Sequence, residues 1–168
     1  DAGDGKEPAF LGTLGSMNEV FVADVPRDQR LWTEPPVLAV PPSQPGRGRP
    51  AQKRQASVAP VTVDSLVRGF GAGDWMRCDL RDSTRGVLRV DIAHRRVWLW
   101  DGEEDAARCW HLIVRREVQS QKTIKYTLSN APVETPLPRL AQMQGQRHWV
   151  ERAFEDAKGE CGRAAHQA

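Results

Sequence analysis

The sequence contains few of the side chains that usually organise small secreted or zinc-dependent proteins. Its three cysteines (Cys78, Cys109 and Cys161) are scattered without a C-x-x-C pair, and its four histidines do not stand at zinc-ligand spacing. A structural zinc site is therefore not expected. The sparse, odd cysteine count also fits a reducing compartment better than an oxidising one.

Long apolar runs and an excess of charge of one sign are absent as well. No run approaches the roughly 20 residues that a membrane helix needs, and no signal peptide is recognisable, so we expect a cytoplasmic protein without membrane contact. The 24 basic and 22 acidic residues give a net charge of only +2, which excludes a strongly basic nucleic-acid coat and leaves room for a local basic patch. The 168 residues suffice for one domain, with or without an insertion.

The N-terminal third contains two segments of different character. "EPAFLGTLGSM" has helical spacing and "EVFVADV" is typical of a buried strand. Residues 35–60 are instead rich in proline and contain four cations without an acid: Arg47, Arg49, Lys53 and Arg54. This stretch is either a solvated linker or a loop that contacts phosphates.

Residues 61–130 are predicted to contain one short helix followed by strands. Thr62 is a candidate N-cap for a helix that the glycines after Phe70 end. Residues 75–130 predict four or five antiparallel strands, of which "GVLRVDIAHRRVWLWD" is either a hairpin or one bent strand. Trp98 and Trp100 are two residues apart and should share one face of a strand; such tryptophans serve either core packing or base stacking.

The C-terminal segment is predicted to be helical from Thr135 and Pro136 onward. In "RHWVERAFEDAKGECG", Arg147, Glu151 and Lys158 lie within about 40° of one another at roughly 100° per residue. They run along the edge of a wide apolar face. This line is either an ordinary ion-pair face or a set of charges that points into a cleft.

The spacing of this line resembles the catalytic signature of bacterial insertion-sequence transposases of the DDE class, in which Tyr, Arg, Glu and Lys recur in this order. Glu151 takes the glutamate position, Arg147 and Lys158 take the basic positions, and Gln144 stands where the tyrosine is usual. "DAGDGKEPAFL" resembles the segment that supplies the second catalytic aspartate, here Asp1, with Asp4 in place of the usual aromatic residue. Segments such as "VFVADVPRDQRLW" and "KYTLSNAP" follow in the order seen in such transposases.

The resemblance implies an α/β fold: a partial RNase H-like core, as in the retroviral-integrase superfamily, interrupted by an antiparallel β-rich insertion and ending in a long C-terminal helix. It divides the chain into four parts. Residues 1–34 belong to the core, 35–60 are the Pro/Arg-rich linker, 61–132 are the insertion, and 133–168 are the helical part of the core with the glutamate motif.

The resemblance also implies metal-dependent cleavage and strand transfer at the ends of an insertion sequence. Asp1 and Glu151 would be catalytic metal ligands in a site for two Mg²⁺ ions, with Mn²⁺ as an alternative. The third carboxylate would lie before Asp1, since Asp24, Asp79 and Asp91 do not match its setting. We therefore expect a fragment that is inactive as it stands.

Double-stranded DNA, both element ends and target, is the expected partner, and the complete protein is expected to be a homodimer near the bacterial nucleoid. Arg147, Lys158, Arg47, Arg49, Lys53 and Arg54 are the candidate DNA-binding residues. Two alternatives stay open: a non-catalytic DNA-binding remnant, and a β-sheet interaction module in which the helix motif is a coincidence.

Overall fold

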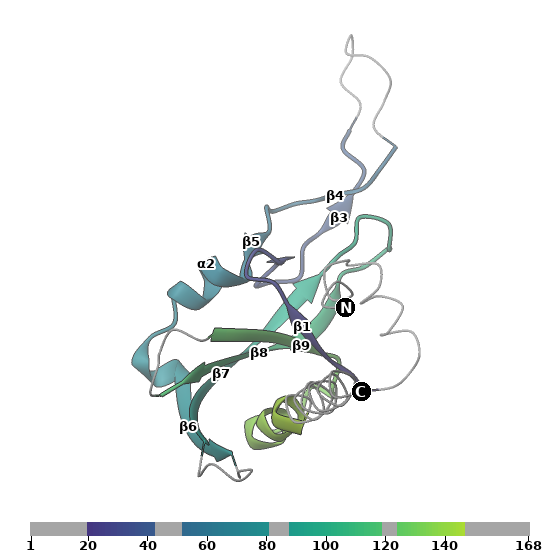
Figure 1. The fold of residues 1–168 in the computed structure, drawn as a ribbon. Coiled ribbons are helices and arrows are strands. Elements are labelled where there is room, and N and C mark those ends of the chain that lie inside the picture. The colour runs from purple at the N-terminus through teal and green to yellow at the C-terminus, as the bar shows by residue number, and fades with distance from the viewer. Residues whose placement is uncertain (1–19, 43–51, 81–87, 119–123, 147–168) are drawn as a thin grey trace, which may run out of the picture.

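The computed structural model describes residues 20–42, 52–80, 88–118 and 124–146, which share one antiparallel sheet and the elements packed on it (Figure 1). The sheet has five strands in the order β1-β9-β8-β7-β6. These strands are β1 (Val22–Val25), β6 (Trp75–Leu80), β7 (Leu88–Leu99), β8 (Arg108–Glu117) and β9 (Ile124–Ser129). Every neighbouring pair is antiparallel.

The antiparallel sheet predicted for residues 75–130 is confirmed for the described residues. "GVLRVDIAHRRVWLWD" contains one continuous strand of 12 residues, β7, so the hairpin alternative is wrong. The run around Ala93 and His94 pairs without interruption with β8, because its apolar and polar residues keep the two-residue period of a strand. Trp98 lies in β7 and Trp100 just beyond its end, so their common face stays a prediction.

Two short strand pairs connect β1 to β6. Strand β2 (Arg30–Leu31) pairs with β5 (Val61–Thr62), and β3 (Leu38–Ala39) pairs with β4 (Gln55–Ala56). The β3–β4 ribbon projects from the sheet (Figure 1). Its base is tied to the body, because the Trp32 indole donates to the Val58 carbonyl at 2.8 Å and Trp32 bridges to Trp98 in β7.

One face of the sheet is covered by α2 (Val63–Arg68), the helix predicted after Thr62. The Thr62 hydroxyl accepts a hydrogen bond from the Ser65 amide at 3.2 Å, as an N-cap does. The glycine-rich segment that follows includes a 3-10 turn, η2 (Ala72–Asp74). The apolar side of α2 joins a core formed by alternate residues of four strands, which are Ala23, Val25, Ala93, Val97, Leu99, Trp110, Leu112, Val114 and Leu128.

The opposite face is covered by helical residues 137–146, which begin directly after the predicted Thr135–Pro136 start. Leu140 and Ala141 pack there against Val90, Ile92 and Ile113. Both faces of the sheet are therefore buried in its central part, and polar side chains on the strands need partners within the protein. Among the described residues no helix is long and apolar enough to cross a membrane.

Candidate functional site

Most of the predicted site residues lie outside the described part of the chain. These are Asp1, Arg47, Arg49, Arg147, Glu151 and Lys158. Lys53, Arg54 and Gln144 are described, and so is the helix that leads directly to Arg147. For the site residues outside this part, the structure thus describes only elements that adjoin them in the sequence.

Lys53 and Arg54 belong to the Pro/Arg-rich segment 35–60 and pair with acids from a distant loop. The Lys53 ammonium lies 2.8 Å from Glu103, and Arg54 pairs with Asp105. The Lys53 side chain is 80% exposed, so this pair contributes little to stability and can be exchanged for another anion. Both acids lie in the turn between β7 and β8. The acidic run "DGEED" is the sequence feature that supplies these acids. Because it lies far from Lys53 along the chain, the sequence did not predict the pairing.

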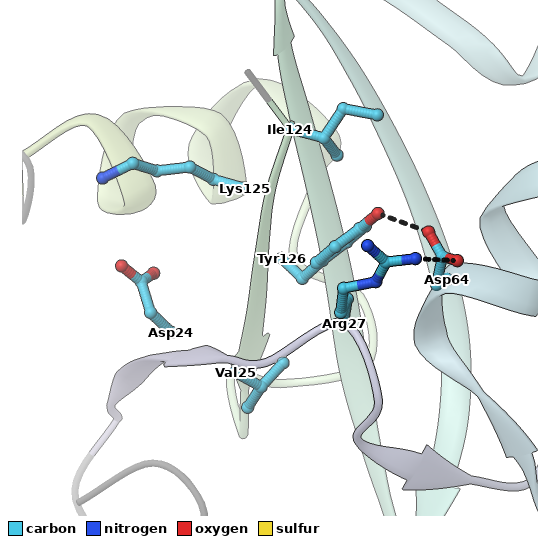
Figure 2. A pocket seen from close by; sticks show the side chains of 7 residues that line it. All are labelled: Asp24, Val25, Arg27, Asp64, Ile124, Lys125 and Tyr126. Carbon is cyan, nitrogen blue, oxygen red and sulfur yellow. Dashed lines mark hydrogen bonds and ion pairs between the residues drawn. The ribbon is translucent and has the colours of Figure 1, made fainter. Parts of the chain in front are cut away.

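A surface cavity of about 490 Å³ lies at the end of β9, beside β1 and α2 (Figure 2). Its lining residues are Asp24, Val25, Arg27, Asp64, Ile124, Lys125 and Tyr126. Figure 2 shows two polar groups on different sides of β9: Asp24 and Lys125 on one side, and Tyr126, Arg27 and Asp64 on the other. The cavity therefore presents charges of both signs rather than a uniform basic surface.

Asp64 organises one side of this cavity. Its carboxylate pairs with Arg27 at 3.2 Å and with Arg68 at 2.7 Å, and it accepts a hydrogen bond from the Tyr126 hydroxyl at 3.3 Å. Burial raises the pKa of Tyr126, and the Asp64 charge raises it further. Because Asp64 lies in the first turn of α2, these contacts join that helix to β9 and stabilise the local structure.

Asp24, on the other side of the cavity, begins a chain of hydrogen bonds that runs under the helix. The Thr127 hydroxyl donates to the Asp24 carboxylate at 3.0 Å, and the Gln144 amide donates to the Thr127 oxygen at 2.7 Å. Thr127 is fully buried and Gln144 is 4% exposed. This series of hydrogen bonds connects β1, β9 and helical residues 137–146, so it joins the segment before Arg147 to the sheet.

Two histidines meet on the same face of the sheet. His94 Nε2 and His111 Nδ1 are 2.7 Å apart, and His111 Nε2 lies 3.0 Å from the Pro132 carbonyl. A carbonyl only accepts, so His111 donates to Pro132 and accepts from His94. Burial, the proximity of His111 and the charges of Arg96 and Arg95 lower the pKa of His94 to about 4. Burial likewise lowers the pKa of His111. Both rings are therefore neutral at pH 7.

Asp91, which is 7% exposed, is held between two arginines on the face that α2 covers. Its carboxylate lies 3.0 Å from Arg77 and 3.3 Å from Arg116. The hydrogen bond from Arg77 is the main cause that lowers the pKa of Asp91. The arrangement is a compensated ion cluster without a coordination position for a metal. In the described residues as a whole, no three His, Cys, Asp or Glu side chains are grouped so as to hold a metal ion.

The comparison with protein families decides to which family the chain belongs. Residues 1–87 match the family described as DDE superfamily endonuclease, and this stretch is more than half of the chain. The chain belongs to the DDE superfamily endonucleases. This membership implies a nuclease-type enzyme with DNA as its substrate. Such enzymes generally depend on divalent metal ions. Comparisons with curated proteins and with solved structures gave no match.

The match to the DDE endonucleases ends at residue 87, between β6 and β7. The elements after it nevertheless share a core with the matched ones. Strand β1 pairs with β9 over four residues, and α2 packs on apolar residues of β7 and β8. The described part of the matched segment and the following strands therefore belong to one folded unit.

Sequence reasoning missed Asp24, Thr127 and Gln144 as a connected group. It noted Gln144 only as a departure from the tyrosine of the signature. Thr127 and Asp24 are separated by 103 positions, and their contact follows from the pairing of β1 with β9. An alternating strand pattern predicts which residues share a face, but it does not predict which strands are neighbours.

Proposed function

We propose that this chain is the C-terminal catalytic portion of a bacterial insertion-sequence transposase, which cuts and joins DNA at the ends of the element. The match of residues 1–87 to the DDE superfamily endonucleases carries this proposal. The spacing of Arg147, Glu151 and Lys158 adds the transposase character, since it resembles the end of the signature in that class. The proposal includes an RNase H-like core and the four-part division 1–34, 35–60, 61–132 and 133–168.

Asp1 and Glu151 are proposed as metal ligands, with a third carboxylate from a segment before Asp1. Carboxylate oxygens are the donors that Mg²⁺ prefers, and a few of them suffice because the ion keeps several waters. A pair of such ions activates the attacking oxygen and stabilises the leaving oxygen of a phosphodiester. Without the third carboxylate, we expect the chain to bind DNA without cutting it.

The described helix supports the proposed role of Glu151. Helical residues 137–146 lie across the face of the sheet, with Leu137 and Met143 in the cluster that contains Cys78 of β6 and with Gln144 bonded to Thr127 of β9. The helix therefore contacts the sheet from β6 to β9, and β9 also pairs with β1. Strand β1 follows the segment that begins with Asp1, and we propose that this segment and the residues after the helix bring Asp1 and Glu151 to one site.

Arg147 and Lys158 are proposed to hold DNA phosphates beside Glu151, with Arg47, Arg49, Lys53 and Arg54 as a second contact region. Arginine suits a bidentate phosphate contact, and lysine acts as a point charge. Lys53 and Arg54 already bind carboxylates, which shows that they are accessible to anions. A homodimer that binds two element ends in the bacterial cytoplasm completes the proposal.

The test uses the protein together with its segment before Asp1, and measures cleavage and filter binding side by side across a salt series. We expect Arg147→Ala and Lys158→Ala each to weaken binding equally on any DNA sequence, and to lower the salt slope by about one. Glu151→Ala should retain binding and lose Mg²⁺-dependent cleavage, because only the carboxylate can hold the metal.

Glu134→Gln is the matched control, since it removes an exposed carboxylate that has no proposed contact with metal or DNA. Cleavage by Glu151→Ala at the parental rate would refute the proposed function. Binding without any cleavage by the parent would favour a DNA-binding remnant.

A further inference from the structure

The hydrogen-bond chain beneath the helix has a defined direction. Thr127 has one hydroxyl proton, and the Asp24 carboxylate, 3.0 Å away, can only accept it. The Thr127 oxygen must then accept from Gln144, which presents its Nε2 amide at 2.7 Å. The Thr127 hydroxyl proton and one Gln144 amide proton are therefore assigned, and the Gln144 side chain has only one compatible orientation.

This orientation is unfavourable for Gln144 itself. Its Oε1 atom is buried and accepts no hydrogen bond, although a buried acceptor without a partner typically costs about 1–3 kcal/mol. An apolar side chain such as leucine would avoid that cost in a site where Leu140 and Ala141 already pack. Stability alone does not explain an amide at this position, and the donation to Thr127 is the interaction that distinguishes glutamine from leucine.

The location of Gln144 indicates what this donation achieves. Leu140 and Ala141 hold the helix against β7 and β8 through apolar contacts. Because such contacts are non-directional, they do not fix the position of the helix along its axis. The contact with Thr127 is directional, and it lies near the end of the described helix. Glu151 is seven residues further on, about two helical turns by the predicted periodicity.

We propose that Gln144 is a positioning residue, which acts through Thr127 and Asp24 to fix the rotation and axial position of the helix that presents Glu151 to the metal. This inference rests on the proposed function. It assigns a task to the residue that departs from the tyrosine of the transposase signature. Gln144 touches neither metal nor DNA in this assignment.

The test measures Mn²⁺ binding by electron paramagnetic resonance in the protein with its segment before Asp1, and then the Mg²⁺ dependence of cleavage. Gln144→Leu should weaken Mn²⁺ binding about 10-fold, the lower end of the effect of removing groups that orient metal ligands. The KM for DNA should not change. Thr127→Val should weaken Mn²⁺ binding in the same way, whereas Thr127→Ser retains the hydroxyl and should bind Mn²⁺ like the parent.

Gln142→Leu is the matched control, because Gln142 is an exposed residue of the same helix. Parental Mn²⁺ affinity in folded Gln144→Leu would overturn the positioning role, even if Glu151→Ala abolishes cleavage. Parental cleavage by Glu151→Ala would instead overturn the proposed function. If Gln144→Leu and Thr127→Val both fail to fold, the variant Asp24→Ala tests the positioning role instead. Asp24 is the half-exposed residue at which the series of hydrogen bonds ends. Weakened Mn²⁺ binding supports the role and parental binding refutes it.

Discussion

Two polar clusters of the described sheet, Asp91 with its arginines and the histidine pair, have different consequences. Asp91 carries a charge that Arg77 and Arg116 compensate, so its carboxylate stays ionised in the fold. His94 and His111 are kept neutral because burial and the charge of Arg96 lower the pKa of both rings. A neutral buried base resists protonation, and its contribution to stability therefore depends on pH.

The histidine pair leads to a prediction about acid stability. The unfolded chain protonates His94 near pH 6.5, whereas the folded protein does so only near pH 4. Between these values the unfolded state binds more protons, so the free energy of unfolding falls as pH is lowered from 6.5 to 4. Thermal unfolding should show His94→Gln losing less stability than the parent over this window, by about 1–3 kcal/mol. Above pH 7 the two curves should run parallel, and equal acid losses would contradict the assignment.

At the scale of elements, the β3–β4 ribbon and the β7–β8 turn are coupled by charge. The ribbon projects from the body (Figure 1), and Lys53 and Arg54, directly before β4, pair with Glu103 and Asp105. The turn itself is well ordered, because Asp101 accepts the amides of Glu103 and Glu104. Glu103 and Asp105 thus form ion pairs with the two cations that the proposed function assigns to DNA binding.

Removing these acids should strengthen DNA binding. In the double variant Glu103→Gln and Asp105→Asn, phosphates no longer compete with carboxylates for Lys53 and Arg54. Filter binding at low salt should show higher affinity on any sequence, with a salt slope steeper by up to about two. Glu134→Gln together with Glu34→Gln is the control, because it removes the same charge from exposed positions elsewhere. An equal gain in DNA affinity in both double variants would show that the change in net charge alone causes the effect.

At the scale of the whole molecule, the proposed site depends on the two ends of the sequence. In the sequence, Asp1 precedes β1 and Glu151 follows helical residues 137–146, and Thr127 of β9 is hydrogen-bonded to both of these elements. The described elements that lie nearest to the two carboxylates in the sequence are therefore joined to each other, although the carboxylates are 150 positions apart. Ligands of one two-metal site, with ions about 3.5–4 Å apart, must lie within several ångströms of each other.

We therefore predict that one metal ion reports on both ends of the chain. Paramagnetic Mn²⁺ should broaden the backbone NMR signals around Asp1 and around Glu151 at the same metal concentration. Glu151→Ala should reduce the broadening at both places, because each ion contacts ligands from both segments. Broadening confined to one of them, or a separation of more than about 15 Å between the carboxylates, would remove the shared metal site.

The sequence by itself determined the local elements and the family. Alternation predicted the antiparallel sheet, the capping residue Thr62 predicted α2, and the Thr135–Pro136 pair predicted the start of the last helix. Each of these signals is carried by residues within one turn or a few pleats of one another. The spacing of Arg147, Glu151 and Lys158 indicated the DDE class, which the match over residues 1–87 then supported.

The tertiary structure alone decided which distant side chains meet. The Asp24–Thr127–Gln144 chain, the histidine pair and the contacts of Lys53 and Arg54 all join segments that the sequence separates. Such contacts follow from strand order and register, which the burial of both sheet faces selects for the molecule as a whole. Periodicity specifies the face on which a residue lies, whereas the neighbour across that face is a property of the complete fold.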